Sequence, residues 1–254
     1  MLENSFRFIF EDYWRSIDKK ILLCFFILFF LGLFFSFSST SSLAGERLNK
    51  DYYFFFTKHL IYTLLAILIM VSISAFQTKF LIKLVIPLFI ISFIFLALVP
   101  IFGTEVKGAK RWLNFYIFRL QPIELLKPFF ILITAKILTN KKLQKTQIKY
   151  FLSFMVLSSI IILLIDQPDL GQSILIIGCW TAVVFISGVN LLYIITFFAF
   201  FLASVSSLLF FLPEKFGYII NRLITFFDPS QGDKFQSSSA LDAIKIGGLK
   251  GQGM

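Results

Sequence analysis

Charged side chains that could bind an anion lie in a short stretch between two long apolar runs. Lys110 and Arg111 precede Trp112 there, and this basic pair could hold a phosphate group at the depth of lipid headgroups. A basic and aromatic anchor at the membrane interface explains the same three residues without any ligand. The residue types therefore predict contact with phosphate or with headgroups, and they leave both interpretations open.

An acid and a base follow this stretch at the start of the next apolar run. Pro122 and Glu124 suit the first turn of a helix, where a fixed φ and a negative charge are favourable. Capping is thus the structural interpretation of Glu124. Lys127 lies deeper in the run, and an ionisable residue inside an apolar span is expected to make a functional contact.

A second polar stretch, Asp166-Gln167-Pro168-Asp169, separates two later apolar runs. Asp169 directly precedes one of these runs and could cap the helix that begins there. Alternatively, its carboxylate faces a polar site between helices. The two interpretations differ in what the Asp169 side chain contacts.

The surroundings of these stretches have the composition of a membrane protein. Of the 254 residues, 58% are hydrophobic and 15% are charged, whereas soluble domains are about one quarter charged. The mean hydropathy is +0.87. A soluble core of this size could not bury so much Phe, Ile and Leu, so the solvent must be lipid. The net charge of +10 then points to anionic headgroups or phosphate-bearing ligands rather than to nucleic acid.

Apolar runs long enough to cross a bilayer predict an all-α polytopic fold with seven transmembrane helices. The runs cover residues 21–42, 56–76, 80–101, 123–139, 149–166, 170–187 and 189–212. A basic tail, residues 1–20, precedes the first run, and the loop at 140–149 is rich in lysine. By the positive-inside rule this loop favours a cytoplasmic N-terminus.

After the seventh run the sequence becomes amphipathic. Apolar residues recur at helical spacing through 213–227, which predicts a helix lying on the membrane surface. Asp228-Pro229 ends this helix. A short helix is expected over 235–246, stopped by Gly247-Gly248. On spacing alone, Asp233 would cap that short helix.

Taken together, these segments resemble the SEDS family (shape, elongation, division and sporulation), which includes FtsW, RodA and SpoVE. The family's G-A-[KR]-R-W motif is matched at 108–112, and its Q-P-D-[LF]-G motif at 167–171. Its Q-P-S-E-x-x-K motif is matched at 121–127, with Ile123 in place of Ser. The loop sequence at 232–236 has the G-D-x-[YF]-Q form of the FtsW branch. Four motifs in the family's order make the resemblance specific.

The resemblance implies a peptidoglycan glycosyltransferase that polymerises lipid II into glycan strands at the division septum. The transfer would invert the donor sugar and release undecaprenyl pyrophosphate, which requires a carboxylate base and cations at the pyrophosphate. The resemblance assigns the base to Asp233. Expected substrate contacts are Lys110, Arg111, Glu124, Lys127, Asp169, Arg222 and Gln236. No metal ligand set and no cofactor are expected, although a divalent cation could accompany the pyrophosphate.

The resemblance also implies location and partners. It places a single SEDS-type domain in the bacterial inner membrane, with a cytoplasmic tail at 1–20, helices over 21–212 and the start of a large periplasmic loop at 213–254. Because SEDS proteins have ten helices, the chain is expected to be an N-terminal portion that is itself inactive. Expected partners are lipid II, membrane lipids, a class B penicillin-binding protein and other divisome proteins. Rival hypotheses are a lipid II flippase or other transporter, and a non-catalytic division scaffold.

Overall fold

The computed structural model describes residues 14–15, 17–40, 53–106, 109–115, 118–211, 235–248 and 251. The chain divides into two compact units, one of residues 1–80 with 234–254 and the other of residues 81–233. The candidate residues from Lys110 to Asp169 all belong to the second unit. Arg222 and Asp233 lie outside the described residues.

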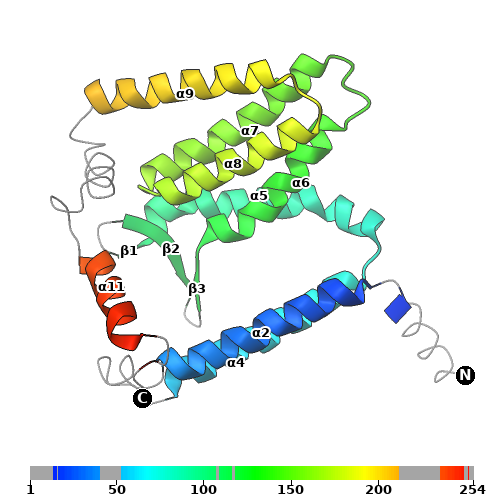
Figure 1. Ribbon diagram of the computed structural model, residues 1–254. Helices are drawn as coiled ribbons and strands as arrows, with labels where there is room; N and C mark the ends of the chain where they lie inside the picture. Colours follow the sequence, from blue (N-terminus) through cyan, green and yellow to red (C-terminus); the bar gives the residue numbers. More distant parts are fainter. Residues whose placement is uncertain are drawn as a thin grey trace, which may run out of the picture. The chain divides into compact units, whose positions relative to one another are not determined.

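Two long apolar helices pack against each other in the first unit (Figure 1). α2 spans Lys19–Thr40 and α4 spans Phe54–Ser74. Asp18 begins α2, because its Oδ1 accepts hydrogen bonds from the backbone N–H groups of Lys20 at 2.9 Å and Ile21 at 3.2 Å. Most large apolar side chains of both helices are exposed, as expected where the solvent is lipid.

The second unit is built from five of the described helices and a small sheet. The helices are α5 (Thr78–Phe102), α6 (Pro122–Leu138), α7 (Thr146–Asp166), α8 (Leu170–Ile186) and α9 (Leu191–Phe211). α6, α7 and α8 pack on one another (Figure 1). Because short links make α7, α8 and α9 antiparallel in turn, α7 ends where α8 begins, and α9 ends on that same side.

The core of this unit follows helical periodicity. Ile123, Leu126 and Phe130 are buried along α6, at intervals of three and four residues. Leu157, Ile160 and Leu164 on α7 repeat the pattern and join the same cluster, with Leu96 from α5 and Ile176 from α8. The apolar stripes of four helices thus meet in one core that holds the helix ends in place.

A three-stranded antiparallel sheet follows α5, where the sequence predicted only a connecting segment. The strands are β1 (Thr104–Val106), β2 (Ala109–Phe115) and β3 (Phe118–Leu120), in that order across the sheet. The chain turns tightly at Gly103, directly after α5. The Gly103 N–H donates a hydrogen bond to the Val99 carbonyl oxygen at 2.7 Å. A Cβ at Gly103 would lie 2.3 Å from that oxygen, so glycine is required at this exit.

All seven predicted runs are helices, within a few residues of the expected bounds, which confirms the all-α polytopic class. Of the helices in the described part of the chain, α2, α4, α5 and α7 are long and apolar enough to cross a membrane. α8 and the first part of α9 are shorter apolar helices. That α6, α8 and α9 also cross the membrane stays a prediction.

The short helix expected after the loop is confirmed as α11, Phe235–Gly247. Gly248 follows it at φ +53° and donates its N–H to the Ile244 carbonyl oxygen at 3.0 Å, which is the expected glycine stop. The amphipathic helix predicted over 213–227 and the capping role of Asp233 lie outside the described residues.

Candidate functional site

Strand β2 directs Lys110 and Arg111 to opposite faces of the small sheet. Side chains alternate along a strand, and exposure follows that alternation here. Lys110 and Trp112 are exposed, whereas Arg111 is half-buried and Leu113 is buried. Glu105 lies opposite Lys110 across the strand pair. The two adjacent cations therefore face different surroundings.

The Arg111 guanidinium holds the turn between α7 and α8. Its Nε donates to the Gln167 carbonyl oxygen at 3.3 Å, and its Nη2 donates to the Pro168 carbonyl oxygen. The same Nε lies 3.7 Å from Asp169 Oδ2. A planar guanidinium can serve several acceptors at once, whereas an ammonium is a point charge. Arg111 thus joins the strand to the Q-P-D turn.

Asp169 occupies the N-cap position of α8, but its side chain makes no capping hydrogen bond. Of the two interpretations of Asp169 that the sequence left open, capping by its side chain is therefore wrong. Asp169 Oδ2 instead accepts a hydrogen bond from Gln121 Nε2 at 3.4 Å and faces Arg111. Only 9% of Asp169 is exposed, so these partners compensate for the burial of a carboxylate.

Gln167 connects the same turn to α5 through a side-chain hydrogen bond. The side chain is 3% exposed, and its Nε2 donates to the Leu96 carbonyl oxygen at 3.2 Å. Leu96 precedes Pro100 on α5, and proline cannot donate an N–H to the carbonyl four residues earlier. Gln167 satisfies this orphaned carbonyl, which explains why an amide is buried among apolar helices.

A second charged cluster lies at the beginnings of α6 and α8. Lys127 Nζ lies 2.5 Å from Glu124 Oε2, and the two side chains are 19% and 51% exposed. Gln172 Nε2 donates to the other carboxylate oxygen of Glu124 at 2.8 Å. The Gln172 Oε1 atom is buried and makes no hydrogen bond within the described part of the chain. Glu124 therefore forms an ion pair with Lys127, and its negative charge also interacts favourably with the dipole at the N-terminus of α6.

The two clusters form successive rungs between α6 and α8. Gln121 contacts Asp169, and one helical turn further on Glu124 contacts Gln172. The two pairs have the same sequence offset, so the first turns of α6 and α8 run side by side in one register. The helix ends, β2 and the Q-P-D turn thus form a continuous polar region above the apolar core.

Three glutamines of this region were not anticipated as site residues: Gln121, Gln167 and Gln172. Their positions beside predicted charges at span ends are the signal that could have found them. The structure assigns no contacts to three other candidates. The backbone of Gln236 belongs to α11, but its side chain lies outside the described residues, as do Arg222 and Asp233.

The described residues hold no group of three or more His, Cys, Asp or Glu side chains placed to bind a metal ion. What they hold is a set of paired charges and amides at one end of a helix bundle. α5 and α7 of the same bundle are apolar helices of membrane-spanning length. Fold and site together define a multi-pass α-helical membrane protein with a polar site at one end of its bundle.

The family follows from comparison with known proteins. The family model FTSW_RODA_SPOVE, described as "Cell cycle protein", matches residues 18–254, and the chain belongs to this family. Family membership confirms the SEDS resemblance of the sequence motifs.

Two named relatives show the extent of the match. A probable peptidoglycan glycosyltransferase FtsW of Wigglesworthia glossinidia brevipalpis is 31% identical, over 93% of this chain and 65% of its own length. The protein of the same name from Haemophilus influenzae is 30% identical, over 93% of this chain and 60% of its own. The chain thus spans a little under two thirds of the length of these relatives.

Two solved structures share the fold. One belongs to a peptidoglycan synthase complex that coordinates polymerization and crosslinking; it has a TM-score of 0.73 at 23% identity and covers 92% of this chain and 66% of that chain. The other is the rod shape determining protein RodA of Thermus thermophilus, with a TM-score of 0.62 at 24% identity over 75% of this chain and 60% of its own. At these identities the likeness supports the arrangement of the helices alone.

Proposed function

We propose that the full-length protein is a peptidoglycan glycosyltransferase that polymerises lipid II at the division septum. The observation that carries the proposal is the family match over residues 18–254, together with relatives that bear the FtsW glycosyltransferase name. The location of the polar site supports it. The site lies at one end of a bundle of apolar helices, at the level where a lipid-borne substrate would present its pyrophosphate and sugar.

The reaction would form a glycosidic bond and break the bond from the anomeric carbon to the pyrophosphate. The 4-hydroxyl of the acceptor sugar attacks the anomeric carbon of the donor with inversion, and Asp233 accepts the hydroxyl proton. Undecaprenyl pyrophosphate leaves with the electron pair and needs no proton from a second acid. No cofactor takes part in this scheme, and a divalent cation could assist the leaving group.

Cations stabilise the leaving pyrophosphate in this proposal. Lys127 is the candidate that the geometry supports best, because it is largely buried near the substrate end and has one carboxylate partner. Lys110 is exposed on the other face of β2, and Arg222 lies outside the described residues. Arg111 acts differently, because its contacts with the Q-P-D turn make it a positioning residue.

Helix alternation supports a role for Asp233 at the same end. α9 ends at Phe211 on the side where α7 ends and α8 begins, and the chain continues from there towards residue 233. In the proposed topology the N-terminus is cytoplasmic and this side faces the periplasm of the inner membrane. The lysine-rich loop at 140–149 lies on the opposite side, in agreement with the positive-inside rule.

The test is lipid II polymerisation by the full-length protein in detergent, with its partner present and glycan chains separated on a gel. Asp233→Asn keeps size and polarity but removes the proton acceptor, and a loss of about 10²- to 10⁴-fold in rate is expected. Asp242→Asn is the matched control, because Asp242 is exposed on α11. Polymerisation by Asp233→Asn at the parent rate, with unchanged thermal stability, would overturn the assignment.

The same assay separates an enzyme from a transporter. An ion pair in apolar surroundings, such as Glu124 with Lys127, also occurs along transport pathways. Detergent micelles separate no compartments, so transport cannot produce polymer. A parent protein that makes no polymer yet moves lipid II across liposomes would favour the transporter, and inactivity in both assays would favour a scaffold.

We also propose that the protein works with a class B penicillin-binding protein and other divisome proteins. The structural neighbour from a peptidoglycan synthase complex supports this proposal. Full-length protein purified from its native membrane in mild detergent should carry the transpeptidase with it. Recovery of the protein alone, at native expression, would contradict this partnership.

A further inference from the structure

The Q-P-D turn is held at two points by one earlier segment of the chain. At the first point, Gln167 Nε2 donates to the Leu96 carbonyl oxygen within α5 at 3.2 Å. At the second point, Arg111 on β2 donates to the backbone carbonyl oxygens of Gln167 and Pro168. The segment that runs from α5 to β2 therefore contacts both the side chain and the backbone of the turn.

The acceptor in α5 is provided by a proline. In a regular α-helix the Leu96 carbonyl would accept a hydrogen bond from the N–H of residue 100, but Pro100 has no N–H. Leu96 is 0% exposed, so solvent does not replace the missing donor. A carbonyl without a donor is costly in such surroundings. The Pro100 break and the Gln167 amide thus complement each other.

α5 has few other polar links to the rest of its unit. In the described part of the chain, one further side-chain hydrogen bond reaches α5 from a later helix, from Lys136 Nζ to the Ile82 carbonyl oxygen at 3.5 Å. That contact is exposed and lies near the start of α5. Apolar contacts are non-directional and permit axial shifts. The Gln167 amide is therefore the buried polar contact that determines where along α5 the turn lies.

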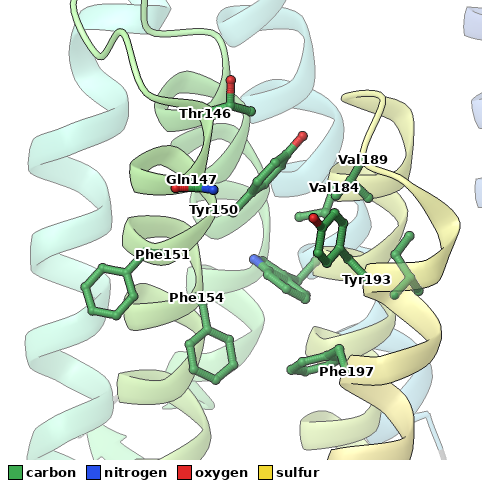
Figure 2. A pocket seen from close by; sticks show the side chains of 11 residues that line it. Thr146, Gln147, Tyr150, Phe151, Phe154, Val184, Val189, Tyr193 and Phe197 are labelled. Atoms are coloured by element: carbon green, nitrogen blue, oxygen red, sulfur yellow. The ribbon is translucent and has the colours of Figure 1, made fainter.

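The helix that follows the turn, α8, is open on its α9 side. A groove of about 560 Å³ lies between α7, α8 and α9 (Figure 2). Val184 of α8 lines this groove together with Tyr193 and Phe197 of α9. α8 packs instead on α6 and α7. The position of α8 therefore depends on those two helices and on the anchoring of the turn.

The position of α8 decides two contacts of the polar site. Asp169, the last residue of the turn, accepts a hydrogen bond from Gln121 at 3.4 Å. Gln172, three residues further on, donates to Glu124 at 2.8 Å, and Glu124 pairs with Lys127. An axial shift of α8 would lengthen both hydrogen bonds. A misplacement of about 1 Å near reacting groups can cost about 100-fold in rate.

We propose that Gln167 is a positioning residue, and that its acceptor is the carbonyl freed by Pro100. Gln167 fixes the start of α8 against α5, and through Gln172 it fixes the Glu124–Lys127 pair. The catalytic consequence rests on the proposed glycosyltransferase function. The coupling between Gln167 and Pro100 does not depend on that function.

A double-mutant cycle in the full-length protein tests the coupling. Gln167→Met keeps the length of the side chain but removes the donor, so the melting temperature should fall by several degrees. Pro100→Ala supplies an N–H to the Leu96 carbonyl from within the helix. In that background, Gln167→Met should lower the melting temperature by no more than about half as many degrees, because the carbonyl is already satisfied.

Two matched controls accompany the cycle. Pro87→Ala removes an exposed proline from the same helix and should not change the cost of Gln167→Met. Gln147→Met changes an exposed glutamine in the first turn of α7 and should leave the melting temperature unchanged.

Two readouts separate positioning from a purely structural role. Backbone hydrogen exchange over residues 165–176 should be faster in Gln167→Met and should stay faster in the double variant, because the turn has lost its anchor in both. Lipid II polymerisation should fall by about ten-fold or more in both variants, although the double variant recovers stability. A role limited to satisfying the carbonyl would restore stability, exchange and polymerisation together.

Each remaining outcome decides one part of the proposal. Additive changes in melting temperature would show that Gln167 does not serve the carbonyl freed by Pro100, and would overturn the coupling. Parent-like exchange and polymerisation in the double variant would overturn the positioning role. A parent protein that makes no polymer would contradict the glycosyltransferase proposal, whereas the melting temperatures and hydrogen exchange would still support or overturn the role of Gln167.

Discussion

The Arg111 guanidinium and the Asp169 carboxylate face each other, with Nε 3.7 Å from Oδ2, across the gap between a surface strand and a helix start. The contact joins two of the sequence motifs that define the family. Because Arg111 also donates to two backbone carbonyls of the intervening turn, several contacts tie the strand to the turn. The carboxylate of Asp169 is thereby fixed beside Gln121 at the first rung between α6 and α8.

Arg111→Met should destabilise the protein, whereas Lys110→Met should not. Methionine keeps the apolar stem of Arg111, but it leaves two carbonyls without their donor and the largely buried Asp169 without its cationic partner. Hydrogen bonds to charged groups are worth about 1.5–3 kcal/mol, so the free energy of unfolding should fall by a similar amount. Unfolding in detergent, followed by tryptophan fluorescence, measures the change. Equal stability of the two variants would show that the contact is not maintained in solution.

Exchange of charge between Glu124 and Lys127 should separate stability from activity. The single variants Glu124→Gln and Lys127→Met each remove one partner of a contact of 2.5 Å and should lower the melting temperature. The double variant Glu124→Lys with Lys127→Glu restores opposite charges, and its melting temperature should recover. Its lipid II polymerisation should not recover, because the cation has moved by three residues. Recovery of both properties would limit the pair to a structural role.

Two alanine substitutions should have opposite signs. Gly103→Ala places a Cβ 2.3 Å from the Val99 carbonyl oxygen, and such overpacking costs about 1–3 kcal/mol. Gly178 lies within α8, where an added Cβ meets nothing within 4 Å. Gly178→Ala should therefore raise stability by up to about 1 kcal/mol through helix propensity. Thermal melts of both variants give the comparison, and a neutral Gly103→Ala would argue against the tight exit from α5.

Reporter fusions should confirm the proposed topology. A fusion after Met254 should be active on the periplasmic side, and a fusion at Lys142 on the cytoplasmic side. The reason is the alternation of helices between the lysine-rich loop and the end of α9. A reversed pattern would remove Asp233 from the periplasmic face and, with it, the assignment of the catalytic base.

The sequence alone determined the helices and the family. A bilayer requires about 20 apolar residues for each crossing, so the lengths of the apolar runs located all seven helices to within a few residues. The same reasoning placed the charged motifs at the ends of these runs. The glycine stop of α11 was also predictable, because a left-handed residue after a helix is a local requirement.

The tertiary structure decided what these motifs contact. The separation of Lys110 from Arg111 required a strand that hydropathy does not reveal, because alternation along β2 turns adjacent side chains to opposite faces. The partner of Asp169 and the roles of Gln121, Gln167 and Gln172 depend on the register of α6 against α8 and on the approach of the Q-P-D turn to α5. Apolar periodicity specifies which side of a helix faces its neighbours, but many axial shifts satisfy it equally. Side-chain packing in the assembled core selects one of them, and that choice brings distant polar residues within hydrogen-bond distance.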